Sequence, residues 1–178
     1  MGFHIGTSYS RTRHVVTAGA DGRVLLYVVP MWNPTDLQGH EGDAIAAKFS
    51  PDGNVVASAG EYEARLNLSD VATRSLLRAI DVGTIVHAIA FTPNGLVVVA
   101  GQSWPDGNGR IAFYRVEDGA QVVLVTSQTA QSVNGISVSP DGTSFAYGGN
   151  DGVLVHARLG YTAPPPFRAP RLRLSSAR

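Results

Sequence analysis

The histidines are the first residues to consider for chemistry, because a neutral imidazole is a frequent metal ligand and general base. The chain has five, at positions 4, 14, 40, 87 and 156, and no two have His-x-x-x-His or His-x-Glu spacing. The sequence has no cysteine, which excludes disulfides, thiolate metal sites and cysteine nucleophiles. These residues predict neither a metal nor a cofactor.

The aspartates of two Ser-Pro-Asp-Gly runs, Asp52 and Asp141, are the next candidates for acid–base chemistry. They recur inside turns at a repeating interval, which is typical of structural turn residues. The sequence contains neither a Gly-x-Ser-x-Gly elbow nor a glycine-rich phosphate loop followed by Lys-Ser or Lys-Thr. We therefore expect no catalytic residues and predict that the protein is not an enzyme.

The turn that contains these aspartates repeats along the chain of 178 residues. Its copies are residues 50–53, 92–95 and 139–142, and a degenerate copy without Pro or Gly lies at 10–13. Short segments of alternating apolar residues precede and follow each turn, as in hairpins of half-buried strands. The starts of the turns are 40, 42 and 47 residues apart, so the chain contains four repeats.

A second hairpin turn follows in each repeat, at Asp21-Gly22, Asn108-Gly109 and Asp151-Gly152, with the weaker Glu61–Ala64 in the second repeat. Third and fourth strands follow these turns, except that prolines 164–166 make the last fourth strand a poor one. No segment has convincing helical periodicity. The predicted fold is all-β, with four four-stranded antiparallel blades of a β-propeller. We place them at about 1–42, 43–84, 85–132 and 133–160, and a Pro- and Arg-rich tail at 161–178.

The repeats resemble WD40 repeats in the runs Phe49–Gly53 and Phe91–Gly95, in Gly39-His40 and in Leu68–Asp70. The resemblance implies that His40 is a structural residue at its blade edge, with Ser58 as a possible hydrogen-bond partner. It also implies that Tyr27 and Tyr114 take the packing position of the family's tryptophan. The chain departs from the family because no repeat has Trp-Asp and only one has Gly-His.

In this family, the loops between the second and third strands share a face with the links between blades, and partners often bind there. The resemblance thus implies a partner-binding face that would be acidic and would suit a basic peptide or protein. Trp104 lies there in an insertion of about four residues, where it either contacts a partner or packs on its own blade. The expected partner-binding residues are Asp21, Glu61, Tyr62, Trp104, Asp106, Asn150 and Asp151.

The even total charge divides into two parts. Residues 1–159 contain ten basic and fourteen acidic residues, a net charge of −4, whereas residues 160–178 contain four arginines and no acidic residue. A negative body disfavours nucleic-acid binding. No apolar run reaches the length of a membrane span, and the N-terminus lacks the pattern of a signal peptide. We expect a cytoplasmic protein that does not bind membranes.

The length of the chain limits the number of blades and therefore bears on the predicted function. Four blades lie at the lower limit of the usual propeller range, about four to eight. We therefore expect a partial or half propeller, whose function is that of a non-enzymatic interaction scaffold. An alternative is a half-ring that self-associates into an eight-bladed ring with a purely architectural role. A third alternative is a ligand-binding or enzymatic propeller, for which His87 is the only plausible central catalyst.

Overall fold

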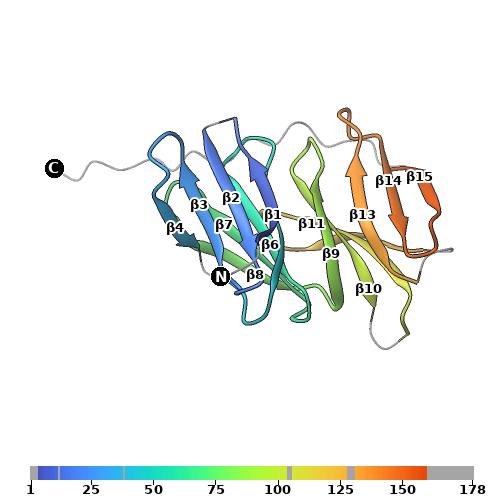
Figure 1. The fold of residues 1–178 in the computed structure, drawn as a ribbon. Coiled ribbons are helices and arrows are strands. Elements are labelled where there is room, and N and C mark those ends of the chain that lie inside the picture. Colours follow the sequence, from blue (N-terminus) through green and yellow to red (C-terminus); the bar gives the residue numbers. More distant parts are fainter. Residues whose placement is uncertain (1–3, 12, 38, 104–105, 128–130, 160–178) are drawn as a thin grey trace.

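In the part of the chain that the structure describes, the protein folds into β-strands joined by turns and loops, with no helix. This computed structural model describes residues 4–159 except 12, 38, 104–105 and 128–130. It forms fifteen strands (Figure 1). Their bounds are β1 His4–Tyr9, β2 His14–Gly19, β3 Val24–Val28, β4 Pro34–Leu37, β5 Ala44–Phe49, β6 Val55–Gly60, β7 Arg65–Asp70, β8 Leu76–Asp81, β9 Thr84–Phe91, β10 Leu96–Ser103, β11 Gly109–Arg115, β12 Gln121–Thr126, β13 Val133–Val138, β14 Ser144–Gly149 and β15 Leu154–Arg158.

The strands form four antiparallel sheets in chain order, which we name blades A (β1–β4), B (β5–β8), C (β9–β12) and D (β13–β15). Each strand pairs with the next one in sequence, so every connection within a blade is a hairpin. The predicted all-β fold of propeller blades is confirmed. Blade D has three strands among the described residues, and the segment predicted for its fourth strand lies outside them.

The recurring turns connect the first and second strands of blades B, C and D. In blade B, Ser50 Oγ donates to Asp52 Oδ1 at 2.6 Å and accepts from the backbone N–H of Val55 at 2.9 Å. Gly53 then has a φ of 76°, in the left-handed region that glycine adopts without strain. Asp141 accepts three hydrogen bonds in the corresponding turn of blade D, which lower its pKa to about 2. The side chains of these turns thus satisfy the backbone where the strands reverse.

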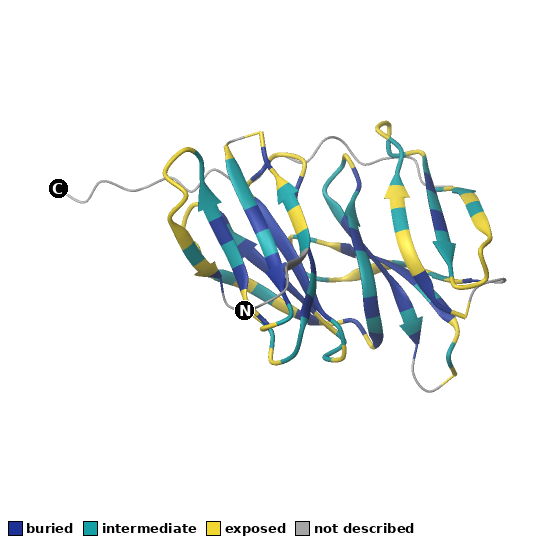
Figure 2. Ribbon diagram, in the orientation of Figure 1, coloured by how far each residue is buried: buried dark blue, intermediate teal, exposed yellow. Residues whose placement is uncertain are grey.

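The core lies between the blades. Each blade has a leading face, toward the following blade, and a trailing face, toward the preceding one. Three buried clusters join leading to trailing faces, A to B, B to C and C to D (Figure 2). In the last joint, the buried Phe113 ring of blade C meets the Phe145 ring of blade D edge-on, with centroids 5.5 Å apart. Neighbouring blades therefore stabilise one another by burying apolar faces.

The four blades form an open row with blades A and D at its opposite ends (Figure 1). The turns between second and third strands lie at one side of this row, at the bottom of Figure 1, together with the links between blades. We call this side the turn face. The turns between first and second strands lie at the other side. No described segment forms a helix long and apolar enough to cross a membrane.

Candidate functional site

A hydrogen-bonded histidine connects blade B to its link with blade A. The His40 side chain is 0% exposed, and its Nδ1 lies 3.1 Å from Glu63 Oε2. Its Nε2 lies 3.0 Å from Ser58 Oγ. A neutral ring that donates from Nδ1 to the carboxylate accepts the Ser58 hydroxyl proton at Nε2. Glu63 also accepts the backbone N–H of Gly42 at 2.6 Å, so one carboxylate ties the β6–β7 turn to the link.

Close backbone contacts explain why glycines surround His40. The backbone N–H of His40 donates to the carbonyl of Gly22 at 2.8 Å. A Cβ on Gly39 would collide with that same carbonyl, and a Cβ on Gly22 would collide with the carbonyl of His40. A Cβ on Gly60 would lie only 3.0 Å from His40 Nδ1. This environment makes His40 a structural anchor of the link, with no open position for a ligand at its ring.

Lowering the pH below about 6.5 is expected to destabilise the protein through His40. Burial lowers the pKa of His40 below its ordinary value of 6.5, although its hydrogen bond to Glu63 acts in the opposite direction. The unfolded chain therefore binds this proton at a higher pH than the folded chain does. The contribution of His40 to the free energy of unfolding is therefore fully present above pH 6.5. As the pH falls below this value, the free energy of unfolding declines by up to about 1.4 kcal/mol per pH unit, until the pKa of the folded state is reached.

Urea unfolding at about pH 7.5 and about pH 5.5 measures this dependence. A His40→Asn variant should show a smaller decline between the two conditions. Some dependence should remain, because burial also lowers the pKa of the half-buried His87 on β9. An equally steep decline in the variant would contradict the assignment to His40.

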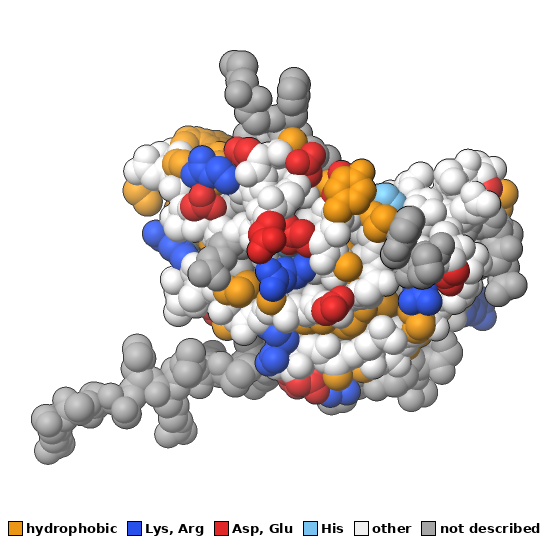
Figure 3. All heavy atoms as spheres, turned by 90° about the horizontal axis from the view of Figure 1, so that it is seen from below, with side chains coloured by type: hydrophobic (Ala, Val, Ile, Leu, Met, Phe, Trp, Pro, Cys, Tyr) orange, Lys and Arg blue, Asp and Glu red, His pale blue; other side chains and the backbone are white. Residues whose placement is uncertain are grey.

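The most prominent side chain of the turn face is Tyr62, in the β6–β7 turn, which is 75% exposed. A hydrogen bond to Glu61, and then the negative charges of Glu61 and Asp43, raise the pKa of the Tyr62 phenol. Burial lowers the pKa of His87, and the negative charge of Glu61 acts in the opposite direction. Figure 3, which shows the molecule from this side, has acidic side chains across its middle with Lys or Arg side chains among them, and a large apolar side chain beside them.

The other residues expected on the partner-binding face mostly make contacts within their own loops. Asp21 and Asp151 accept the backbone N–H groups of Arg23 and Val153, at 3.2 and 3.0 Å. Asn150 Oδ1 accepts from the backbone N–H of Ser132 at 3.3 Å. These contacts order the turns, so the side chains are less available to a partner than Tyr62.

Two further predicted residues belong to the β10–β11 loop. Asp106 accepts a short hydrogen bond from Ser103 Oγ, and its Oδ2 lies 3.9 Å from a guanidinium nitrogen of Arg110. Trp104 lies outside the described residues, so its role in partner binding stays a prediction.

The two tyrosines assigned to the family's tryptophan position lie in different environments. Tyr114 is buried in the joint between blades B and C, where its hydroxyl donates to the Val82 carbonyl at 3.4 Å. Tyr27 lies on the trailing face of blade A, partly exposed, with its ring centroid 6.4 Å from that of Trp32. The difference arises because blade A is the first in the row.

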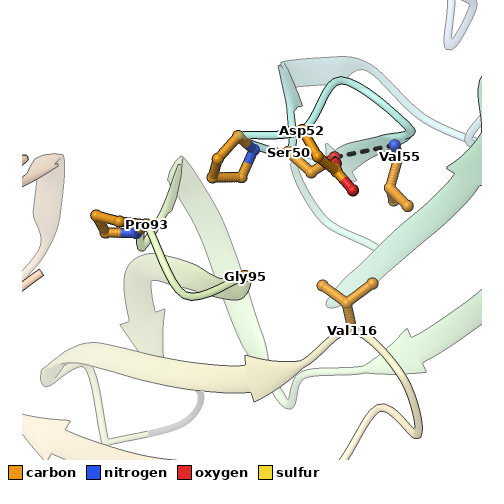
Figure 4. A pocket seen from close by; sticks show the side chains of 7 residues that line it. Ser50, Asp52, Val55, Pro93, Gly95 and Val116 are labelled. Atoms are coloured by element: carbon orange, nitrogen blue, oxygen red, sulfur yellow. Dashed lines mark hydrogen bonds between the residues drawn. The ribbon is translucent and has the colours of Figure 1, made fainter. Parts of the chain in front are cut away.

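A small pocket of about 50 Å³ lies on the side opposite the turn face, between blades B and C (Figure 4). Pro93, Val116 and the Ser50–Asp52 turn line it. The Asp52 carboxylate already accepts hydrogen bonds from Ser50 and Asn54. Desolvation, the largest single influence, raises the pKa of Asp52, but the hydrogen bonds together outweigh it and the pKa is lowered. Among the described residues, no group of three His, Asp or Glu side chains could hold a metal ion.

Sequence reasoning did not single out two acidic residues that the structure places at important positions. Glu63 holds His40 and the link, and Asp43 adds negative charge beside Tyr62. A signal for Glu63 was available, since an acidic residue also lies in the second hairpin turn of the first and last repeats. Which of Glu61 and Glu63 turns inward depends on the conformation of the turn, where Ala64 has a φ of 51°.

The fold is an open row of propeller blades, and a family-model match to one of its repeats confirms the WD40 resemblance seen in the sequence. The family model for "WD domain, G-beta repeat" matches residues 33–63, a stretch that contains His40, Ser58 and Glu63. The similarity to two rice proteins extends over other repeats. The chain is 38% identical over 72 residues to "Small ribosomal subunit protein RACK1y" and 29% identical over 124 residues to "Small ribosomal subunit protein RACK1z" of Oryza sativa subsp. japonica.

These matches cover only part of each relative. They include 37% and 67% of this chain, and 21% and 36% of RACK1y and RACK1z. A match to soybean RACK1, 28% identical over 129 residues, includes 66% of this chain and 39% of the Glycine max protein. The chain thus spans well under half the length of these relatives.

A solved structure shows the same fold. Hydrazine synthase of Kuenenia stuttgartiensis matches 81% of this chain and 43% of its own, with a TM-score of 0.71 and 16% identity. At this identity the likeness shows the fold alone.

Proposed function

We propose that the protein is a non-enzymatic, cytoplasmic interaction scaffold that binds a basic segment of a partner protein on its turn face. The observation that carries the proposal is Tyr62, a large aromatic side chain exposed among carboxylates on a rigid row of blades. Exposed aromatic residues often dominate the energy of an interface once a partner buries them. Rigid strands hold the loop in place, so little order is lost on binding.

Charge favours a basic partner. Glu61 and Asp43 act together on Tyr62, and Glu61 acts on His87. An arginine or lysine side chain that reaches this group can stack on the phenol and pair with a carboxylate. The similarity to proteins named as small ribosomal subunit proteins makes a basic segment of a ribosomal protein the first partner to examine.

Replacing Tyr62 with alanine is expected to weaken binding of an arginine-rich peptide about tenfold, which corresponds to about 1.4 kcal/mol. Fluorescence anisotropy with a labelled peptide of this kind measures the change. Glu61→Gln should weaken binding less and should reduce its dependence on salt, because one attractive charge is lost. Thermal unfolding should show that both variants stay folded, since Tyr62 and Glu61 lie in an accessible turn.

A matched control is Trp32→Ala, which removes another exposed aromatic side chain from the connection between β3 and β4, away from the turn face. This variant should bind the peptide as the parent chain does. Equal affinities of the parent chain and Tyr62→Ala would refute the turn face as the binding surface. Self-association, the architectural alternative, uses different surfaces on the end blades and is tested separately.

A further inference from the structure

The two ends of the row have faces that the rest of the chain keeps covered. On the leading faces, four positions recur in register, two on the second strand and two on the third. In blades A, B and C every one of these residues is at most 1% exposed. They are Val16, Ala18, Val24 and Leu26 in blade A, Ala57, Ala59, Leu66 and Leu68 in blade B, and Val98, Ala100, Ile111 and Phe113 in blade C.

Blade D has Ala146, Gly148, Leu154 and His156 at these positions. By register, Leu154 and His156 are the blade D equivalents of Leu66 and Leu68 in blade B. Leu66 and Leu68 are fully buried, whereas Leu154 is 77% exposed and His156 is also exposed. A leucine that is fully buried in one repeat and mostly exposed in another indicates an apolar surface against which no neighbouring blade packs.

The trailing face of blade A is uncovered in the same way. Its four register positions are Val15, Thr17, Leu25 and Tyr27, all partly exposed, and Tyr9 beside Val15 is 64% exposed. In blades B and C the equivalent residues are at most 4% exposed. Thr17 Oγ1 is shielded from water and has no hydrogen-bond partner in the described part of the chain. The face is therefore largely apolar.

The joint between blades B and C shows what these two faces fit. There the leading face of blade B presents Ala, Ala, Leu and Leu, and the trailing face of blade C presents Val, Val, Ala and Tyr. In the same order, blade D presents Ala, Gly, Leu and His, and blade A presents Val, Thr, Leu and Tyr. The two open faces therefore resemble the two halves of a joint that the chain already forms, with a polar residue on each side.

We infer that the leading face of blade D binds the trailing face of blade A from a second copy of this chain. A two-fold axis then creates a second, identical contact, in which blade D of the second copy binds blade A of the first. The result is a closed ring of eight blades. This inference concerns other surfaces than the turn face and does not depend on peptide binding.

Light scattering of the full chain tests the inference, with two chains per particle as the expected result. Leu154→Asp should give single folded chains and raise the dissociation constant about tenfold or more, because a carboxylate would have to be buried in the joint. The control is Leu77→Asp, which changes an exposed leucine on β8 of blade B and should leave the pair intact. Tyr62→Ala should also leave it intact, which separates the two proposals.

The orientation of the joint is tested by mixing. Tyr9→Asp alters the trailing face of blade A and should also give single chains when it is alone. In a mixture with Leu154→Asp, one unaltered blade D face meets one unaltered blade A face, so pairs should form again. Single chains of the parent protein, particles of more than two chains, or a failure of the mixture to associate would each overturn the inference.

Discussion

Replacing Phe113 with alanine is expected to lower the free energy of unfolding by about 3–5 kcal/mol. Its ring is fully buried on the leading face of blade C and meets Phe145 of blade D edge-on. Removing the ring leaves a cavity in the joint that strands on both sides cannot easily fill. Urea unfolding followed by circular dichroism measures the loss.

The loss should be concentrated at blade D. This blade joins the row through the cluster that contains Phe113, so weakening the cluster should allow β13–β15 to open before the other blades. Hydrogen exchange should then become faster in β13–β15 than in β5–β8. Tyr62→Ala serves as the control, since an exposed aromatic residue should contribute within about 0.5 kcal/mol to stability. A loss no larger than that of the control would contradict the role of Phe113 in the joint.

The recurring turns made the fold predictable from the sequence. Ser50-Pro51-Asp52-Gly53 encodes its own geometry, because proline restricts φ, the serine and aspartate side chains bond within the turn, and glycine accepts a positive φ. The alternating residues on either side then determine which side chains share a face of the blade. The repeat interval and these local rules were sufficient for an all-β propeller prediction.

The joints between blades could not be derived in the same way. Alternation shows that Val97 and Val99 lie on one face of β10 and that Val98 and Ala100 lie on the other. Both pairs are apolar, so the pattern does not say which face meets the preceding blade. The three buried clusters supply that answer. For the same reason, the uncovered leading face of blade D could be recognised only by comparing equivalent positions.

The candidate binding residues stay predictions, and the structure shows that their local contacts differ. Turn residues such as Asp21 and Asp151 are acidic in sequence, but their carboxylates accept backbone N–H groups of their own loops. The Tyr62 hydroxyl interacts with the neighbouring Glu61, but its ring packs against little and the residue stays 75% exposed. Spacing identifies the loops that share a face, whereas the contacts within each loop determine which side chains are available.

Replacing Gly101 with alanine is expected to destabilise the protein by about 3 kcal/mol or more. Gly101 lies at an irregularity in the pairing of β10 with β9. An added Cβ would collide with the carbonyl oxygen of Ile85 and lie 2.8 Å from its carbonyl carbon and 3.1 Å from the Cα of Val86. These are backbone atoms of β9, which also packs against the neighbouring blades, so the strand cannot yield without disturbing those contacts.

Gly42→Ala is the matched control for this change. A Cβ there would have only Glu63 Oε1 nearby, at 3.9 Å, which is an ordinary contact. The loss of a glycine also reduces the conformational entropy of the unfolded chain. The free energy of unfolding of this variant should therefore lie within about 0.5 kcal/mol of the parent value or slightly above it. Similar urea midpoints for the two variants would show that β9 can move aside. A large difference would instead show that β9 and β10 are held at a fixed separation, and that a residue without a side chain is required there because two backbones meet.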